Sequence, residues 1–289
     1  MNFNDFVESF LQAKITCPAC TRQKLLQYIR RLQKGGHHFG ELDIHSLSEG
    51  DCAQVISACW STPAARNEAR RILHNMFTYA EHVGWMSKNP LDGVECEAVP
   101  VQLCEPLSLA QVSNLLRVVS WPQYRCCSPA VGLMLWAGIR SYEVRRLRWH
   151  DIHFDSDVIV LGENVSKTGI ARRVTLQPIL LEWLRRTRYL YLLNGKIVPR
   201  AWIRLWKEIR NQAAFHSCSP DSLRYTFAAY HIRKFGNFVQ LQHESGLSSS
   251  VVQKIGLRAA HIPSAEADIF WGELPTLLLL SREGGFKVN

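Results

Sequence analysis

The 289-residue sequence lacks the features of a membrane or secreted protein. Its longest aliphatic cluster, residues 277–280, is far too short to cross a bilayer. Residues 1–5 carry an acid early and have no basic region before an apolar stretch, which argues against a secretory leader. A hydrophobic content of 47% with 20% charged residues is typical of a globular chain rather than a disordered one. Together these properties predict a cytoplasmic protein.

Tyrosine and paired cysteines are unevenly distributed. The last of the eight tyrosines is Tyr230, so the final fifth of the chain contains none. Among nine cysteines, Cys17 and Cys20 form the only Cys-x-x-Cys pair, with His37 and His38 downstream. A zinc site there is conceivable, but the spacing fits no standard ligand pattern and a second cysteine pair is missing. Two incidental cysteines near a helix start are favoured, and no metal or cofactor is expected.

The basic charge lies in the second part of the chain. The net charge is +9; residues 1–104 hold 10 Lys and Arg against 11 Asp and Glu, whereas residues 105–289 hold 24 against 14. This asymmetry favours a polyanionic partner for the second part, although solvated surface arginines would produce the same count.

Periodicity predicts a helical first domain over residues 1–95. Apolar residues recur at helical spacing from Phe3, and Ser48 and Thr62 are typical helix-start residues. A segment with little periodicity, residues 96–106, is the expected linker. Residues 107–289 form the expected second domain, in which Ser108 begins a helix.

The second domain is expected to be mainly helical with a small antiparallel sheet. Residues 158–161 and 172–176 have the β-branched and aliphatic character of two strands, joined by a polar turn that contains Lys167. Helices are expected after Arg140 (through Glu143, Val144 and Leu147), over residues 179–192, and through most of the remainder.

Four motifs in order resemble the tyrosine recombinases, the phage-integrase family. The helical bundle of the first domain ends at Asn89-Pro90 and resembles the core-binding (SAM-like) domain of that family. Residues 137–152 (AGIRSYEVRRLRWHDI) are similar to its first arginine box, and Lys167-Thr168-Gly169 followed by RRVTL matches its lysine hairpin. Residues 221–228 (DSLRYTFA) resemble its second arginine box. The resemblance covers nearly the whole chain and implies a core-binding bundle joined to a recombinase-type domain, clamped around duplex DNA.

The resemblance also implies roles for individual residues. Recombinases of this kind attack a phosphodiester with a tyrosine, without metal or nucleotide. By match, Arg140 and Arg224 would hold the phosphate, because guanidinium groups bind its oxygens bidentately. Lys167 would protonate the leaving oxygen, and Glu143 would brace Arg140. Arg172 and Arg173 are further candidates for phosphate contacts.

Three positions depart from the family pattern. Asp221 stands where the second box usually has histidine, and would salt-bridge Arg224 or cap the helix instead. Leu247 replaces the histidine of a Gly-His-Ser segment, and Gly256 or Leu257 occupies the place of the nucleophilic tyrosine, depending on a one-residue shift. Catalytic groups act as a unit, so these losses predict a protein without strand cleavage. Other side chains could in principle replace the missing nucleophile or histidines. Packing or surface roles are favoured for all of them: Tyr225, Tyr230, His243, His261 and residues 248–250.

The sequence therefore favours a degenerate, integrase-like protein that binds double-stranded DNA without cutting it. An active recombinase or nicking enzyme with a displaced or partner-supplied nucleophile is one alternative. A protein-interaction module that has lost DNA binding is another, since the first domain is nearly neutral. The apolar segment 269–280 would pack either against a neighbouring subunit, its own kind or an active recombinase, or within its own domain. No membrane or small-molecule partner is expected.

Overall fold

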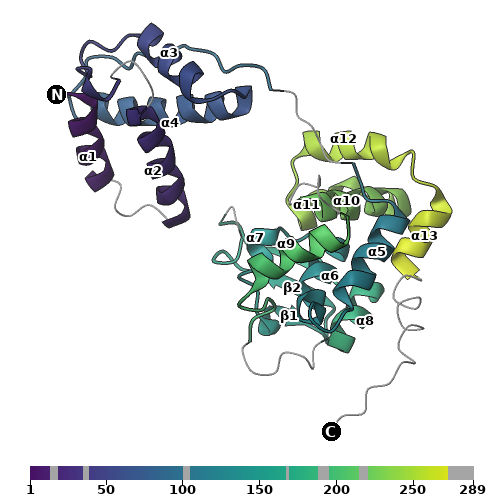
Figure 1. The fold of residues 1–289 in the computed structure, drawn as a ribbon. Helices are drawn as coiled ribbons and strands as arrows, with labels where there is room; N and C mark the ends of the chain where they lie inside the picture. The colour runs from purple at the N-terminus through teal and green to yellow at the C-terminus, as the bar shows by residue number, and fades with distance from the viewer. Residues whose placement is uncertain are drawn as a thin grey trace. The chain divides into compact units, whose positions relative to one another are not determined.

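The chain divides into two compact units, Met1–Val101 and Gln102–Asn289 (Figure 1). The computed structural model describes residues 1–13, 19–34, 39–99, 105–166, 169–187, 195–214 and 221–272. Cys17, His37, His38 and Lys167 fall outside these ranges, as does the side chain of Cys20. The finer boundaries of the linker, residues 96–106, stay a prediction. No helix among the described residues has the length and apolar character to cross a membrane.

The first unit is a bundle of four helices around a phenylalanine-rich core. The helices are α1 (Phe3–Ala13), α2 (Ala19–Lys34), α3 (Glu49–Cys59) and α4 (Pro63–His82), with a short 3-10 helix, η1, at Phe39–Glu41. Phe3, Phe6 and Phe77 are fully buried, and each such ring contributes about 1.5–3 kcal/mol by leaving water. Ser48 and Thr62 cap α3 and α4, as the sequence predicts.

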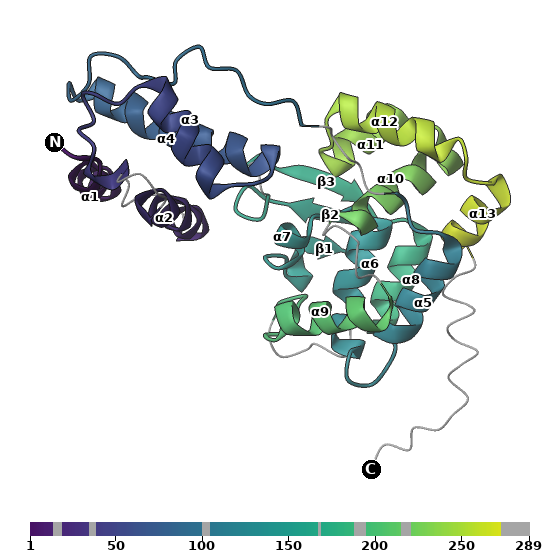
Figure 2. The same ribbon diagram turned by 45° about the horizontal axis from the view of Figure 1, so that its top comes forward.

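The second unit is built around two buried helices. They are α6 (Ser128–Trp136), in which every residue is buried, and α10 (Ser222–Phe235). Helix α10 packs against α6 and also against α12 and α13 (Figure 2). The helices that surround this pair are α5 (Leu109–Val119), α8 (Pro178–Thr187), α9 (Trp202–Gln212), α11 (Phe238–Ser245), α12 (Ser249–Ala259) and α13 (Ser264–Gly272).

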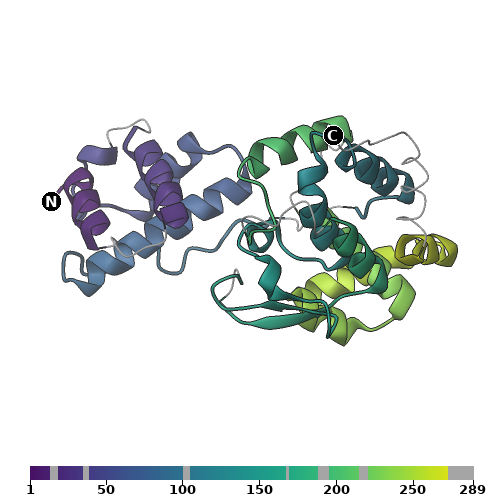
Figure 3. The ribbon, with the colours of Figure 1, turned by 90° about the horizontal axis from the view of Figure 1, so that it is seen from below.

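A three-stranded antiparallel sheet lies at one side of this unit (Figure 3). Strands β1 (Ile152–His153), β2 (Val158–Leu161) and β3 (Arg172–Thr175) pair in that order, with Ile159 opposite Val174. Helix α11 packs against β3. This contact brings the end of α11 beside the first arginine box.

The sequence predicts most of these elements, with two differences. The two longer strands and the mainly helical class are confirmed. Strand β1 was missed, because two residues are too few to show alternation. The helix after Arg140 is a single turn, α7 (Ser141–Val144), rather than one that extends through Leu147. It ends early because the following segment pairs with residues 195–197 instead: Trp149 N–H donates to the Gly195 carbonyl (2.8 Å).

Candidate functional site

Glu143 is the centre of a buried ion-pair cluster in the second unit. Its side chain has no exposure, and both of its oxygens accept from Arg172, Oε1 from Nη1 at 2.9 Å and Oε2 from Nη2 at 2.6 Å. Arg140 adds its Nη1 on Oε1 (3.0 Å) and its backbone N–H on Oε2 (3.1 Å). Burial alone would raise the pKa of Glu143, but Arg172 and then Arg140 outweigh it and lower the pKa to about 2. The carboxylate is therefore ionised throughout the physiological range.

The same arginines bind the end of α11. Arg140 donates from Nη2 to the Gly246 carbonyl (2.8 Å), and Arg172 donates from Nε to the Glu244 carbonyl (2.8 Å). Gly246 has φ +64°, a left-handed conformation that ends the helix and favours glycine. Thr175 on β3 also donates to Glu244 Oε1 (2.7 Å). The cluster thus joins α7, β3 and α11, three elements that are far apart in the sequence.

Arg224 adds a third, more deeply buried guanidinium. It lies in the first turn of α10, is 3% exposed, and donates to the Gly138 carbonyl at 3.3 Å. Burial, and then the positive charge of Arg140, lower the pKa of Arg224 to about 10, although the charge of Asp221 acts in the opposite direction. Arg224 is still protonated at neutral pH. The Gly138 carbonyl that Arg224 binds lies two residues before Arg140 in the chain.

The cluster carries an excess of positive charge. Arg140, Arg172 and Arg224 supply three positive charges; the first two pair with Glu143, and the charge of Asp221 acts on Arg224. The side chain of Arg140 is 17% exposed against 8% for that of Arg172, so Arg140 is the more accessible of the two. Fixed guanidinium donors of this kind suit a phosphate or another oxyanion. Within the described part of the chain, no group of His, Cys, Asp and Glu side chains could hold a metal ion.

Helix α12 presents no group that can act as a nucleophile at position 256 or 257. Leu257 is 74% exposed and purely apolar. A Cβ atom on Gly256 would lie 2.8 Å from the ring of Phe238 at the start of α11. The space into which a side chain at position 256 would extend is therefore partly filled by an aromatic ring.

The chain is similar in sequence to a known recombinase. A tyrosine recombinase of Thermosipho africanus (strain TCF52B) is 24% identical over 226 residues, which are 75% of this chain and 78% of that protein. No family model matches. The chain is thus similar in sequence to a tyrosine recombinase.

Solved integrase structures show the extent of the shared fold. A λ integrase dimer (residues 75–356) bound to a COC′ core site superimposes with a TM-score of 0.72 at 14% identity, over 89% of this chain and 95% of that one. The Tn1549 transposon integrase (residues 82–397) in complex with circular intermediate DNA gives a TM-score of 0.69 at 17% identity, over 93% and 99%. The helical architecture with a small antiparallel sheet is thus that of the integrases.

The structure brings most of the residues matched by resemblance to one place. Arg140, Glu143, Arg172 and Arg224 form the cluster, and Arg173 is exposed on β3. Lys167 lies outside the described residues, so its role stays a prediction. The phosphate contact expected of Arg172 also stays a prediction, because this guanidinium already pairs with Glu143.

The positions that depart from the family pattern lie beside the cluster. Asp221 directly precedes α10; its carboxylate does not accept a capping hydrogen bond, contrary to one of the two expectations, and its charge acts on Arg224 instead. Leu247 is half-buried against the core and immediately follows Gly246, whose carbonyl binds Arg140. Ser248 precedes α12 at the N-cap position.

The side chains considered as replacements for the missing nucleophile or histidines are buried in the core or exposed on the surface. Tyr230 is 1% exposed and stacks on Phe270 at 4.2 Å between ring centroids, and burial together with Glu266 raises its pKa to about 12. Tyr225 packs against the core, and His243 and His261 are exposed. Of the segment 269–280, residues 269–272 end α13 with Phe270 buried in its own unit, and the rest lies outside the described residues.

Sequence reasoning missed the partners that hold the cluster together. The Gly138 and Gly246 carbonyls and Glu244 have no signature, because tertiary packing brings them to the arginines. The pairing of Arg172 with Glu143 had a weak signal: in a strand, Arg172 and Val174 share a face, and Val174 is buried. That alternation separates Arg172 from its exposed neighbour Arg173.

Proposed function

We propose that this chain binds double-stranded DNA through the Arg140–Arg224 cluster and does not cleave it. The observation that carries the proposal is the contrast between the two parts of the site. The guanidinium groups that would hold a phosphate are fixed in place, whereas positions 256 and 257 offer glycine and an exposed leucine.

The chemistry explains why this combination would bind DNA without reacting. Arg140 and Arg224 would donate to the non-bridging oxygens of one phosphate, and exposed Arg173 would add a second contact along the backbone. Cleavage by this family's route needs a phenolate, which forms the covalent link to phosphorus. Neither Gly256 nor Leu257 has an atom that can form that bond.

The relatives support DNA as the ligand. The names of the λ and Tn1549 integrase structures describe complexes with DNA, and λ integrase is described as a dimer on a core site and as a tetramer on a Holliday junction. Association of this chain with a second copy, or with an active recombinase, belongs to the same proposal.

Two measurements on the full chain test the proposal. Fluorescence anisotropy with a labelled duplex, at two salt concentrations, is expected to show binding that weakens steeply with salt. Incubation with supercoiled DNA, followed by a denaturing gel, is expected to show neither relaxed product nor a covalent protein–DNA adduct. An adduct would establish the active recombinase instead, and no binding even at low salt would establish the protein-interaction module.

A further inference from the structure

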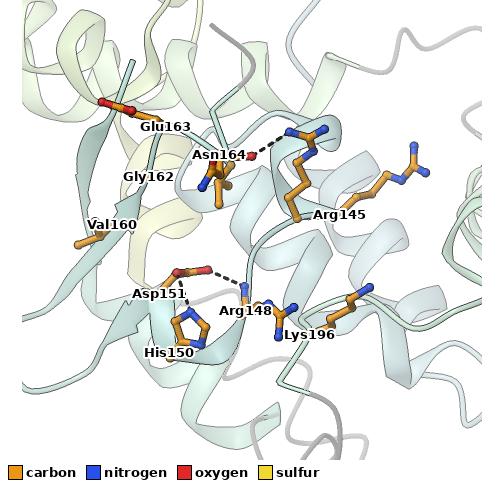
Figure 4. A pocket seen from close by; sticks show the side chains of 11 residues that line it. Arg145, Arg148, His150, Asp151, Val160, Gly162, Glu163, Asn164 and Lys196 are labelled. Atoms are coloured by element: carbon orange, nitrogen blue, oxygen red, sulfur yellow. Dashed lines mark hydrogen bonds and ion pairs between the residues drawn. The ribbon is translucent and has the colours of Figure 1, made fainter. Parts of the chain in front are cut away.

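The second unit contains a basic cavity that shares no lining residue with the Arg140–Arg224 cluster. Its volume is about 580 Å³. Four cationic side chains line it, Arg145, Arg146, Arg148 and Lys196, together with the end of β2 and the turn after it (Figure 4). The cations come from two segments of the chain separated by almost fifty residues.

Backbone pairing fixes the two segments against each other. Arg148 and Lys196 form an antiparallel bridge, in which Trp149 N–H donates to the Gly195 carbonyl (2.8 Å) and Ile197 N–H donates to the Leu147 carbonyl (3.2 Å). Leu147 and Ile197 are fully buried, so the bridge is anchored in the core. The position of the cationic side chains therefore follows from the fold rather than from a mobile surface loop.

The positive charges of the cavity are only partly compensated. Asp151 is occupied locally: it accepts from the Arg148 backbone N–H at 2.7 Å and pairs with His150 at 3.3 Å. Glu163 is the other carboxylate in the lining. Arg145, Arg148 and Lys196 form no ion pair with any residue that the structure describes. With four cations against two carboxylates, the lining has an excess charge of about +2 at neutral pH.

A second basic cavity adjoins the first. It has a volume of about 330 Å³, shares Arg145 and Lys196 with the first, and adds Arg200. One arginine and one lysine thus face both cavities. A ligand with several negative charges would contact them in either cavity.

We propose that these adjoining cavities form a second phosphate-binding site, separate from the Arg140–Arg224 cluster. The ligand would carry two or more phosphate groups, because the cations are spread over both cavities rather than gathered at one point. The phosphates would come either from the backbone of a nucleic acid or from a free polyphosphate. The volume of the first cavity lies in the range of small-ligand sites, and its exposed cations would also accept a backbone that passes across them.

Calorimetry with tripolyphosphate, on the full chain without DNA, tests the site directly. The variant Arg145→Gln with Lys196→Gln removes the two cations that both cavities share, and is expected to bind tripolyphosphate at least about tenfold more weakly. Both side chains are exposed, so unchanged thermal unfolding is expected and would show that the fold is intact. The matched control is Arg185→Gln with Lys207→Gln, which removes one exposed arginine and one exposed lysine outside both cavities and is expected to bind within about twofold of the parent.

The results separate this site from the one proposed to bind duplex DNA. Arg140→Gln is expected to leave tripolyphosphate binding within about twofold, because Arg140 lines neither cavity. Equal affinity in the Arg145→Gln/Lys196→Gln variant and the parent would overturn the proposal, as would an equal loss in the control or in Arg140→Gln. Addition of a short duplex then identifies the source: displacement of tripolyphosphate indicates a nucleic-acid backbone, and simultaneous binding of both ligands indicates a free polyphosphate.

Discussion

Replacement of Glu143 by glutamine removes the negative charge at the centre of the arginine cluster. The amide keeps the shape of the side chain but cannot balance Arg172, whose side chain is only 8% exposed, or Arg140. Removing one partner of a buried ion pair typically costs about 3–5 kcal/mol of unfolding free energy. The pKa gives a similar value, because its fall from 4.5 to about 2 corresponds to about 3 kcal/mol.

The sign of the pH dependence follows from the same shift. The folded state holds the pKa of Glu143 below its unfolded value, so this stability is fully present above about pH 4.5 and is lost as the pH falls towards about 2. The unfolding free energy of the parent should therefore approach that of Glu143→Gln in acid. About 2 kcal/mol of the difference is expected to disappear by pH 3.

Urea denaturation followed by tryptophan fluorescence measures the unfolding free energy of the second unit, which contains Glu143. Trp60 and Trp85 lie in the first unit and the other seven tryptophans in the second, so the signal reports mainly on the unit that contains the cluster. Glu182→Gln is the control: it breaks an exposed pair with Arg186 and should cost less than about 1 kcal/mol. A difference below about 1 kcal/mol between Glu143→Gln and the parent at pH 7, or one that does not shrink at pH 3, refutes the reasoning.

Three further outcomes are expected. Arg140→Gln should weaken duplex binding and reduce the slope of log K against log salt by about 1, measured by anisotropy at several salt concentrations; an unchanged slope would remove Arg140 from the phosphate contacts. His231 is 1% exposed, and burial lowers its pKa to about 4. The unfolded chain therefore takes up the proton first, and the unfolding free energy falls as the pH drops from about 6.5 to 4. His231→Phe should abolish about 2 kcal/mol of that loss at pH 5, and equal pH profiles of the variant and the parent would contradict this expectation. Gly256→Tyr should not produce a covalent adduct on a denaturing gel, because the new side chain meets Phe238 and the site has Asp221 and Leu247 in place of histidines; an adduct would show that the tyrosine alone was missing.

The sequence predicts the elements better than it predicts the contacts among them. Ser48, Thr62 and Ser108 each mark a helix start by a local signal, a side-chain oxygen that caps the first turn, and the structure begins helices there. The early end of α7 depends on pairing with residues 195–197, which no local pattern reveals. Tertiary contacts decided that difference.

The contacts within the arginine cluster could not be predicted from local sequence patterns either. The motifs indicate Arg140 and Arg224 one residue at a time, but the carbonyls of Gly138 and Gly246 reach them only through packing of α10 and α11. No local pattern indicates the cavity at Arg145 and Lys196, because its two sides are joined by backbone hydrogen bonds between distant segments. Charge asymmetry along the chain indicated a basic second part and could not say where the cations gather.

The burial of Glu143 gives the arginines of the cluster a structural role that positions 256 and 257 do not have. Arg140 and Arg172 support the structure of the unit, because they connect α7, β3 and α11 through one carboxylate. Position 257 is a surface position of α12 on which no packing depends. Substitutions in the cluster are therefore opposed by unfolding, whereas substitutions at position 257 are free of that penalty. If the proposed function holds, the fold itself would retain the arginines while it places no such constraint on position 257.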